Sequence, residues 1–283
     1  MNNIEKSPDR IRILEKIEEY EKKGWFDRDV EDDPHGKELK ITEVDYLNKK
    51  IFNRIATKFS NTVARIFMNN LIKKHELIIK DIIGLENYTK LDTGAIITCN
   101  HFNALDSFAM HIAYDYSGHK KRKLYKIIKE ENYTSFPGFY GLLMRHCNTL
   151  PLSSNKETMK HFIHATDTIL KRGDFVLIYP EQSMWWNYRK PKPLKVGAFK
   201  FATKSKVPIL PCFITMNDSE IIGKDGFPIQ EYTINISKPI YPDYEKSVKE
   251  NADYLMKENA EIWKNIYEKS YGISLEYTKA ETY

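Results

Sequence analysis

Residues 99–106 contain a histidine and an aspartate at a spacing that suits acid–base chemistry. The segment reads Cys-Asn-His-Phe-Asn-Ala-Leu-Asp, with His101 and Asp106 five positions apart. A carboxylate bound to one imidazole nitrogen fixes the tautomer and leaves the other nitrogen free to take a proton from an attacking hydroxyl. We therefore predict that His101 is a general base oriented by Asp106. The alternative is a turn histidine capped by an aspartate, because this spacing also occurs by chance.

A second polar turn, in residues 177–183, places a glutamate after another apolar run. The run Leu-Ile-Tyr-Pro leads into Glu181. Because ligands of open α/β sheets gather at the carboxyl edge of the strands, Glu181 is expected beside His101. The side chains of these two turns that we predict to contact the substrate are Asn100, Asn103, Glu181, Gln182 and Ser183. The alternative for Glu181 is a helix-capping turn after Pro180.

Basic side chains follow the glutamate turn and could bind phosphate by charge and hydrogen bonding. They are Arg189, Lys190, Lys192 and Lys195, and Arg145 lies upstream. We predict that Arg145, Arg189 and Lys195 contact the substrate. The alternative is a solvated loop. Between the turn and these residues, Trp185, Trp186 and Tyr188 either pack against an acyl chain or cofactor, or form the core of the loop.

Strand patterns alternate with helix patterns from about residue 77 onward. Apolar runs predict strands at 96–99, 124–128, 147–152, 175–179, 209–214 and 232–236. Helix patterns fall near 104–116, 156–171, 197–205 and 244–269. The predicted fold class is therefore α/β, with a mostly parallel or mixed sheet flanked by helices. The turns that carry His101 and Glu181 each follow a predicted strand.

Residues 1–76 are predicted to form an N-terminal helical segment ahead of an α/β domain at 77–283. A first helix is expected at 8–23, and the acidic residues 27–38 resemble a linker. In a long helix at about 43–75, apolar residues recur at three- and four-residue steps, and the opposite face is basic. The apolar stripe either packs on the core or contacts an anionic membrane surface through residues 44–74.

The composition restricts the class of protein. Of the 283 residues, 41% are hydrophobic, which is enough for one sizeable α/β core. The net charge of +5 suggests an anionic partner, but aromatic residues are not interleaved with lysines as a nucleic-acid surface requires. We see no run of about 18 apolar residues and no signal peptide, and therefore expect a cytoplasmic protein, with peripheral contact at the inner face of the membrane left open. The cysteines, 99, 147 and 212, suggest free thiols rather than a metal site.

In their order and spacing, these motifs resemble those of the glycerolipid acyltransferases, in particular the 1-acylglycerol-3-phosphate (lysophospholipid) acyltransferases. The resemblance covers about residues 90–240. It includes Asn-His-x-x-x-x-Asp, a glycine-containing segment at 138–152, the Pro-Glu pair at 180–181 and Val-Pro-Ile-Leu-Pro at 207–211. It implies acyl transfer from acyl-CoA or acyl-carrier protein to the hydroxyl of a lysophospholipid-like acceptor, without a cofactor or metal.

The same resemblance implies roles for single residues. His101 would be the base, Asp106 its partner, and Glu181 would help to place the acceptor. Lys195 and Gly197 match the Lys and Gly that follow the Pro-Glu block, and Pro208 and Pro211 match the proline block that shapes the pocket. We also predict that residues 138–142 border the acyl channel through Gly138, Phe139, Gly141 and Leu142. Backbone amides around His101 are expected to bind the oxyanion.

Two departures from the family pattern concern the acceptor. The family's Pro-Glu-Gly-Thr-Arg is replaced by Pro-Glu-Gln-Ser-Met at 180–184, and Ser153 and Ser154 stand where an arginine usually follows the second block. Those arginines are expected to hold the acceptor's phosphate. Either Arg145, Lys156, Arg189 and Lys192 replace them, or the acceptor is not lysophosphatidate. The alternative function is a non-catalytic lipid- or membrane-binding protein on the same fold.

Overall fold

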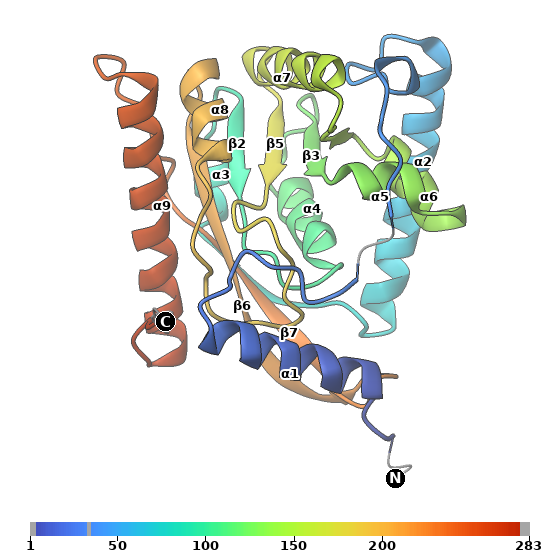
Figure 1. Ribbon diagram of the computed structural model, residues 1–283, viewed down its shortest axis with the longest axis vertical. Coiled ribbons are helices and arrows are strands. Elements are labelled where there is room, and N and C mark those ends of the chain that lie inside the picture. The colour runs from blue at the N-terminus through green and yellow to red at the C-terminus, as the bar shows by residue number, and fades with distance from the viewer. Residues whose placement is uncertain (1–3, 33–34, 278–283) are drawn as a thin grey trace.

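The computed structural model describes residues 4–32 and 35–277, and these contain one mixed sheet of seven strands in the order β1-β7-β6-β2-β5-β3-β4 (Figure 1). The strands are β1 Ile78–Ile83, β2 Ala95–Thr98, β3 Leu124–Ile128, β4 Thr149–Pro151, β5 Phe175–Ile178, β6 Ile209–Ile222 and β7 Pro228–Ile236. Only the β6–β7 pairing between neighbours is antiparallel within this described sheet. The strands from β6 to β4 therefore bring their carboxyl ends to one edge.

Helices cover both faces of the sheet. One face packs on α3 Leu85–Thr89, α4 Asp106–Tyr116 and the end of α2 Ile51–Lys73. The other packs on α7 Lys156–Lys171, α8 Gly197–Ser205 and α9 Val248–Tyr271. Because both faces are covered, every residue of β2 and β5 is buried. This explains why these strands are continuous apolar runs rather than alternating ones.

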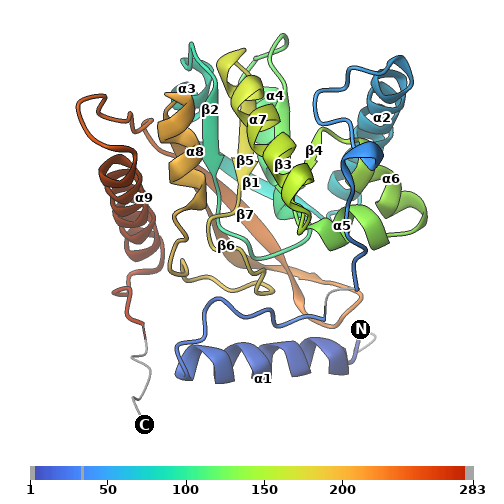
Figure 2. The same ribbon diagram turned by 45° about the horizontal axis from the view of Figure 1, so that its top comes forward.

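The N-terminal region lies across the carboxyl edge of the sheet. Helix α1 Pro8–Lys22 is on the side toward which the arrows of β2, β5 and β3 point (Figures 1 and 2). We call residues 25–32 and 35–39 the N-terminal arm. The arm leads to the short helix η1 Ile41–Glu43 and then to α2, which packs on α6 Gly138–His146. A further helix, α5 Glu130–Ser135, follows β3.

The α/β fold class expected from the sequence is confirmed. The predicted helices at 156–171 and 197–205 and the strand at 124–128 match α7, α8 and β3 residue for residue. The long N-terminal helix begins at Ile51 rather than near residue 43, because residues 44–50 form turns. The sequence reading missed β1, α3, α5 and α6. The division of the chain at residue 76 stays a prediction, and Pro34 of the expected linker lies outside the described residues.

Candidate active site

Strand pairing brings the two polar turns together. Thr98 of β2 lies opposite Ile178 of β5, and Cys99 N donates to Ile178 O at 3.3 Å. The chain then leaves the sheet at the same level on both strands. Beyond the strand ends, His101 N donates to Glu181 Oε2 at 3.0 Å. The expected meeting of the His101 and Glu181 turns at the carboxyl edge is thus a feature of the fold.

His101 and Asp106 form a hydrogen-bonded pair. Nδ1 of His101 lies 2.7 Å from Oδ2 of Asp106. The Asp106 side chain is 1% exposed, whereas that of His101 is 24% exposed. With Nδ1 held by the carboxylate, Nε2 is the imidazole atom left for a substrate proton. The carboxylate would also stabilise the imidazolium that forms.

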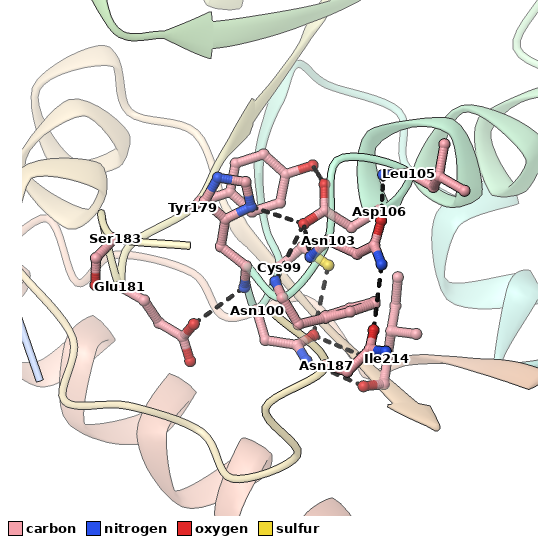
Figure 3. Close-up of polar contacts among 12 residues, drawn as sticks. Cys99, Asn100, Asn103, Leu105, Asp106, Tyr179, Glu181, Ser183, Asn187 and Ile214 are labelled. Carbon is pink, nitrogen blue, oxygen red and sulfur yellow. Dashed lines mark hydrogen bonds and ion pairs between the residues drawn. The ribbon is translucent and has the colours of Figure 1, made fainter. Parts of the chain in front are cut away.

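Asp106 is held on its other side by Tyr179, a residue that sequence reasoning did not select. The Tyr179 hydroxyl donates to Asp106 Oδ1 at 2.7 Å (Figure 3), and the ring stacks on the His101 imidazole with centroids 4.2 Å apart. Burial, and then the nearby Asp106 charge, raise the pKa of Tyr179 well above its usual value. Tyr179 is therefore a neutral donor. Its place directly before Pro180 and Glu181 was the signal that could have identified it.

Glu181 is buried and forms part of the framework of the site. Its oxygens accept hydrogen bonds from His101 N at 3.0 Å and Lys192 N at 2.7 Å. Lys192 Nζ lies 4.0 Å from Glu181 Oε2 and donates to Ser183 O at 2.5 Å. Burial raises the pKa of Glu181 and lowers that of Lys192 to about 8, and their mutual attraction opposes both shifts. The pair fixes the turn that faces His101.

The backbone amides around His101 are already used by carboxylates. His101 N donates to Glu181, and Phe102 N and Asn103 N point to Asp106 Oδ2 at 3.3 and 3.5 Å. This differs from the expectation that these amides bind the oxyanion. They instead hold Asp106 and Glu181 in position.

Comparison with known proteins finds similarity to acyltransferases. Residues 81–215 match the family model described as Acyltransferase. This stretch of the chain is therefore similar to an acyltransferase domain. The chain is 27% identical over 199 residues to the chloroplastic 1-acyl-sn-glycerol-3-phosphate acyltransferase BAT2 of Brassica napus. The aligned region covers 68% of this chain and 53% of that protein. The chain thus spans about half the length of this curated relative.

A solved structure shares the fold of this chain. The 1-acyl-sn-glycerophosphate (LPA) acyltransferase PlsC from Thermotoga maritima matches with a TM-score of 0.50 and 18% identity, over 80% of this chain and 99% of that one. At this identity the likeness shows the α/β fold alone. The resemblance to acyltransferases expected from the motifs is confirmed by the family model and the curated relative.

Two asparagines of the turn that carries His101 are occupied by internal contacts. Asn100 is buried, and its amide pairs with both the N–H and the C=O of Ile214 on β6, at 2.8 and 3.0 Å. Asn103 Oδ1 accepts from Leu105 N, and its Nδ2 donates to Asn187 Oδ1 at 3.2 Å. Contrary to expectation, Asn100 joins the histidine turn to β6, and Asn103 joins it to the 183–188 loop.

Gln182 and Ser183 differ sharply in environment. Gln182 is exposed and has a φ of +68°, in the left-handed region that favours glycine. Ser183 is buried, and its hydroxyl donates to Phe26 O in the N-terminal arm at 3.0 Å. The structure therefore places Ser183 in an internal contact rather than on a substrate surface, and leaves Gln182 at the surface.

Most of the predicted phosphate-binding cations have a partner within the protein. Arg145 Nη1 donates to the carbonyls of Tyr133 and Phe136 at 3.3 and 3.1 Å. Arg189 pairs with Asp218 on β6 at 2.7 Å. The remaining partners are Asp27 for Lys195, Glu21 for Lys190 and Glu181 for Lys192. Lys156 is exposed at the start of α7. The structure thus does not gather these residues into one phosphate site.

The aromatic residues after the glutamate turn form the core of their loop. Trp185 is fully buried, stacks on Phe26 with centroids 5.6 Å apart, and donates from Nε1 to Arg28 O at 2.8 Å. Trp186 is also buried, against Phe227. This is the second of the two alternatives that the sequence left open. These rings attach the arm to the site.

The predicted acyl-channel residues lie at the start of α6. A Cβ on Gly141 would lie 2.0 Å from Phe136 O, so this glycine is required by a close backbone contact. Phe139 is partly exposed and packs edge-on against Phe67 of α2 at 5.0 Å. Their role in an acyl channel stays a prediction. Within residues 4–32 and 35–277, we find no group of three or more His, Cys, Asp and Glu side chains that could hold a metal ion.

Proposed function

We propose that the protein transfers an acyl group from an acyl thioester to the hydroxyl of a lysophospholipid-like lipid, with His101 as the general base. The observation that carries this proposal is the partly exposed imidazole whose Nδ1 is bound by the buried Asp106 carboxylate at 2.7 Å. A non-catalytic lipid-binding protein has no need for an oriented base. The match of residues 81–215 to the acyltransferase family supports the same reaction class.

The reaction can be written on the residues present. Nε2 of His101 takes the proton of the lipid hydroxyl as its oxygen attacks the thioester carbonyl carbon. The new C–O bond forms, and the tetrahedral intermediate collapses with cleavage of the C–S bond. The imidazolium, stabilised by Asp106, returns the proton to the thiolate. The acyl donor would be acyl-CoA or acyl-carrier protein, and the acceptor would be of the 1-acylglycerol-3-phosphate type or a relative of it.

The test is release of free thiol from acyl-CoA or acyl-carrier protein in the presence of lysolipids. We expect turnover with at least one acceptor, and a loss of about 100-fold or more in His101→Ala. His161→Ala is a matched control, because this histidine lies on α7. Equal turnover by wild type and His101→Ala would overturn the mechanism. Binding of lysolipid without any acyl transfer would favour the non-catalytic alternative.

We further propose that α2 contacts an anionic membrane surface. Large apolar side chains on α2 are exposed, with Phe52 77% and Phe59 60% exposed. We call Ile51, Phe52, Ile55, Phe59 and Ile66 the apolar face of α2. Basic residues on the same turns, Lys50, Arg54 and Lys58, are also exposed. The stripe thus packs on the core only toward its end, at Met68 and Leu71. No helix in the described part of the chain is long and apolar enough to span a bilayer.

A further inference from the structure

A carboxylate lies at the carboxyl end of β4, where the family pattern led us to expect a phosphate-binding arginine. Glu130 accepts hydrogen bonds from Leu39 N at 2.6 Å, Ser154 N at 3.1 Å and the Ser153 hydroxyl at 2.8 Å. Burial alone would raise the pKa of Glu130, but these hydrogen bonds outweigh it and lower that pKa below its usual value. This part of the edge therefore carries a fixed negative charge near neutral pH.

Two lysines at the same edge are covered by carboxylates of the N-terminal arm. Lys129 directly follows β3, and its Nζ lies 2.9 Å from Asp29. Lys195, whose N–H donates to Pro180 O beside Glu181, lies 3.3 Å from Asp27. Because β2, β5 and β3 are neighbours in the sheet, these lysines flank the turns that carry His101 and Glu181. Each of these lysines is thus already paired with a carboxylate of the arm.

The arm is anchored at both ends, which keeps its carboxylates in place. Near its start, Phe26 packs on Trp185, and Phe26 O accepts the Ser183 hydroxyl. Near its end, Ser135 donates to His35 O at 2.9 Å. A side chain on Gly36 would approach Glu131 Cα within 2.9 Å, so the arm runs tightly along α5. Asp27 and Asp29 therefore lie between two attached points of the arm, one at the 183–188 loop and one at α5.

A phosphate monoester would meet an unfavourable field here. It carries close to two negative charges near neutral pH and needs unpaired donors or cations. The predicted phosphate-binding residues Arg145, Arg189 and Lys192 instead contact other groups of the protein. The arm places one carboxylate beside each of the two lysines, and Glu130, which follows Lys129 in the chain, adds a further negative charge. Juxtaposed like charges discriminate strongly against a wrong ligand.

We propose that the acyl acceptor is a lysolipid whose head group is uncharged or zwitterionic rather than a phosphate monoester, and that Asp27, Asp29 and Glu130 select against that dianion. The proposal rests on the acyl-transfer function proposed above and narrows its acceptor. The acidic arm then acts as a specificity element. Its carboxylates form ion pairs with Lys129 and Lys195, which an anionic head group would otherwise bind.

The experiment compares three acceptors with the same acyl chain, using acyl-CoA and acyl-carrier protein as donors. They are 1-acylglycerol, 1-acylglycerol-3-phosphocholine and 1-acylglycerol-3-phosphate. For the wild type we expect kcat/KM to be at least about 10-fold higher with one of the first two than with the phosphate. In Asp27→Asn/Asp29→Asn, kcat/KM for the phosphate should rise about 10-fold relative to that for the uncharged acceptor.

Asp32→Asn is the matched control, because Asp32 belongs to the arm but forms no ion pair among residues 4–32 and 35–277. It should keep the wild-type preference. A second readout needs no variant: millimolar inorganic phosphate should not compete with the acceptor in the wild type.

The outcomes separate the two proposals. The inference is wrong if the wild type uses 1-acylglycerol-3-phosphate best, or if inorganic phosphate inhibits it competitively. Either result would leave the proposed acyl-transfer function intact. An arm variant that melts like wild type but keeps its acceptor preference also overturns the inference. Absence of transfer to all acceptors, or transfer that survives His101→Ala, overturns the proposed function itself.

Discussion

The Tyr179 hydroxyl donates to Oδ1 of Asp106 at 2.7 Å, while Oδ2 of the same carboxylate faces His101. One carboxylate is thus shared between a neutral phenol and an imidazole. The phenol disperses part of the carboxylate charge and fixes its orientation. In addition, its ring supports the imidazole face at a centroid distance of 4.2 Å.

Tyr179→Phe keeps the ring and removes that hydrogen bond. Asp106 then stabilises the imidazolium more strongly, so the acid limb of the pH profile of kcat/KM should move to higher pH by about one unit or less. Looser positioning of the carboxylate should lower kcat about 2- to 10-fold. The measurement is the full pH profile with the best acceptor. A uniform loss at all pH values with an unmoved acid limb would show that the hydroxyl has a structural role alone.

Asp106→Asn tests whether the buried carboxylate sets the tautomer of His101. An amide can present its N–H to Nδ1, which places the imidazole proton on Nε2 and blocks proton abstraction. We expect kcat to fall about 1,000-fold or more, with KM changed much less. Asp115→Asn, on the same helix but paired with Arg65, is the control and should retain activity. A loss for Asp106→Asn that appeared mainly in KM would contradict a role in catalysis.

The buried ion pair predicts a large effect on stability. Lys192→Met leaves Glu181 buried without its cation, and should lower the free energy of unfolding by about 3 kcal/mol. Lys190→Met removes a more exposed lysine that pairs with Glu21, and should cost about 1 kcal/mol or less. Urea denaturation of both variants measures the difference. Equal losses would show that the Lys192–Glu181 contact does not stabilise the turn.

The same pair gives a pH dependence. Burial lowers the pKa of Lys192 to about 8 in the folded protein, below the roughly 10.4 of an unfolded lysine. Between these values the unfolded chain binds more protons, so the contribution of Lys192 makes the folded state more stable as pH rises. The stability advantage of wild type over Lys192→Met should therefore grow from about pH 8 to about pH 10. An advantage that shrinks over this window would contradict a lowered pKa of Lys192 in the folded protein.

The sequence predicted well the features that local patterns determine. The buried runs of β2 and β5 and the polar residues after them placed His101, Asp106 and Glu181 at one edge. What it could not predict depends on contacts between distant segments. Nothing near Asn100 shows that its amide will pair with Ile214, and nothing near Lys195 shows that Asp27 will reach it. Helices α5 and α6 were missed because they are short and held by packing on β4 and α2.

Gln182 offers a test of backbone strain beside the site. Its φ of +68° costs a non-glycine residue about 1 kcal/mol, since the Cβ approaches the backbone closely. Gln182→Gly should therefore raise the free energy of unfolding by up to about 1 kcal/mol, less the entropy gained by the unfolded chain. Gln182→Ala keeps the Cβ and should bring no gain. If Gln182→Ala stabilises the protein as much as Gln182→Gly, the effect comes from loss of the glutamine side chain and not from relief of backbone strain.

The apolar face of α2 predicts binding to anionic vesicles. Phe52 and Phe59 are both exposed, and burying a phenylalanine in an apolar phase is favourable by roughly 1.5–3 kcal/mol. Phe52→Ser/Phe59→Ser should thus weaken cosedimentation with phosphatidylglycerol-containing vesicles by about 10-fold or more. Tyr244→Ser, an exposed aromatic outside α2, should bind like wild type. Because Lys50, Arg54 and Lys58 lie on the same turns, binding should also weaken with added salt. Binding that depends on neither the phenylalanines nor the salt concentration would show that α2 does not face the membrane.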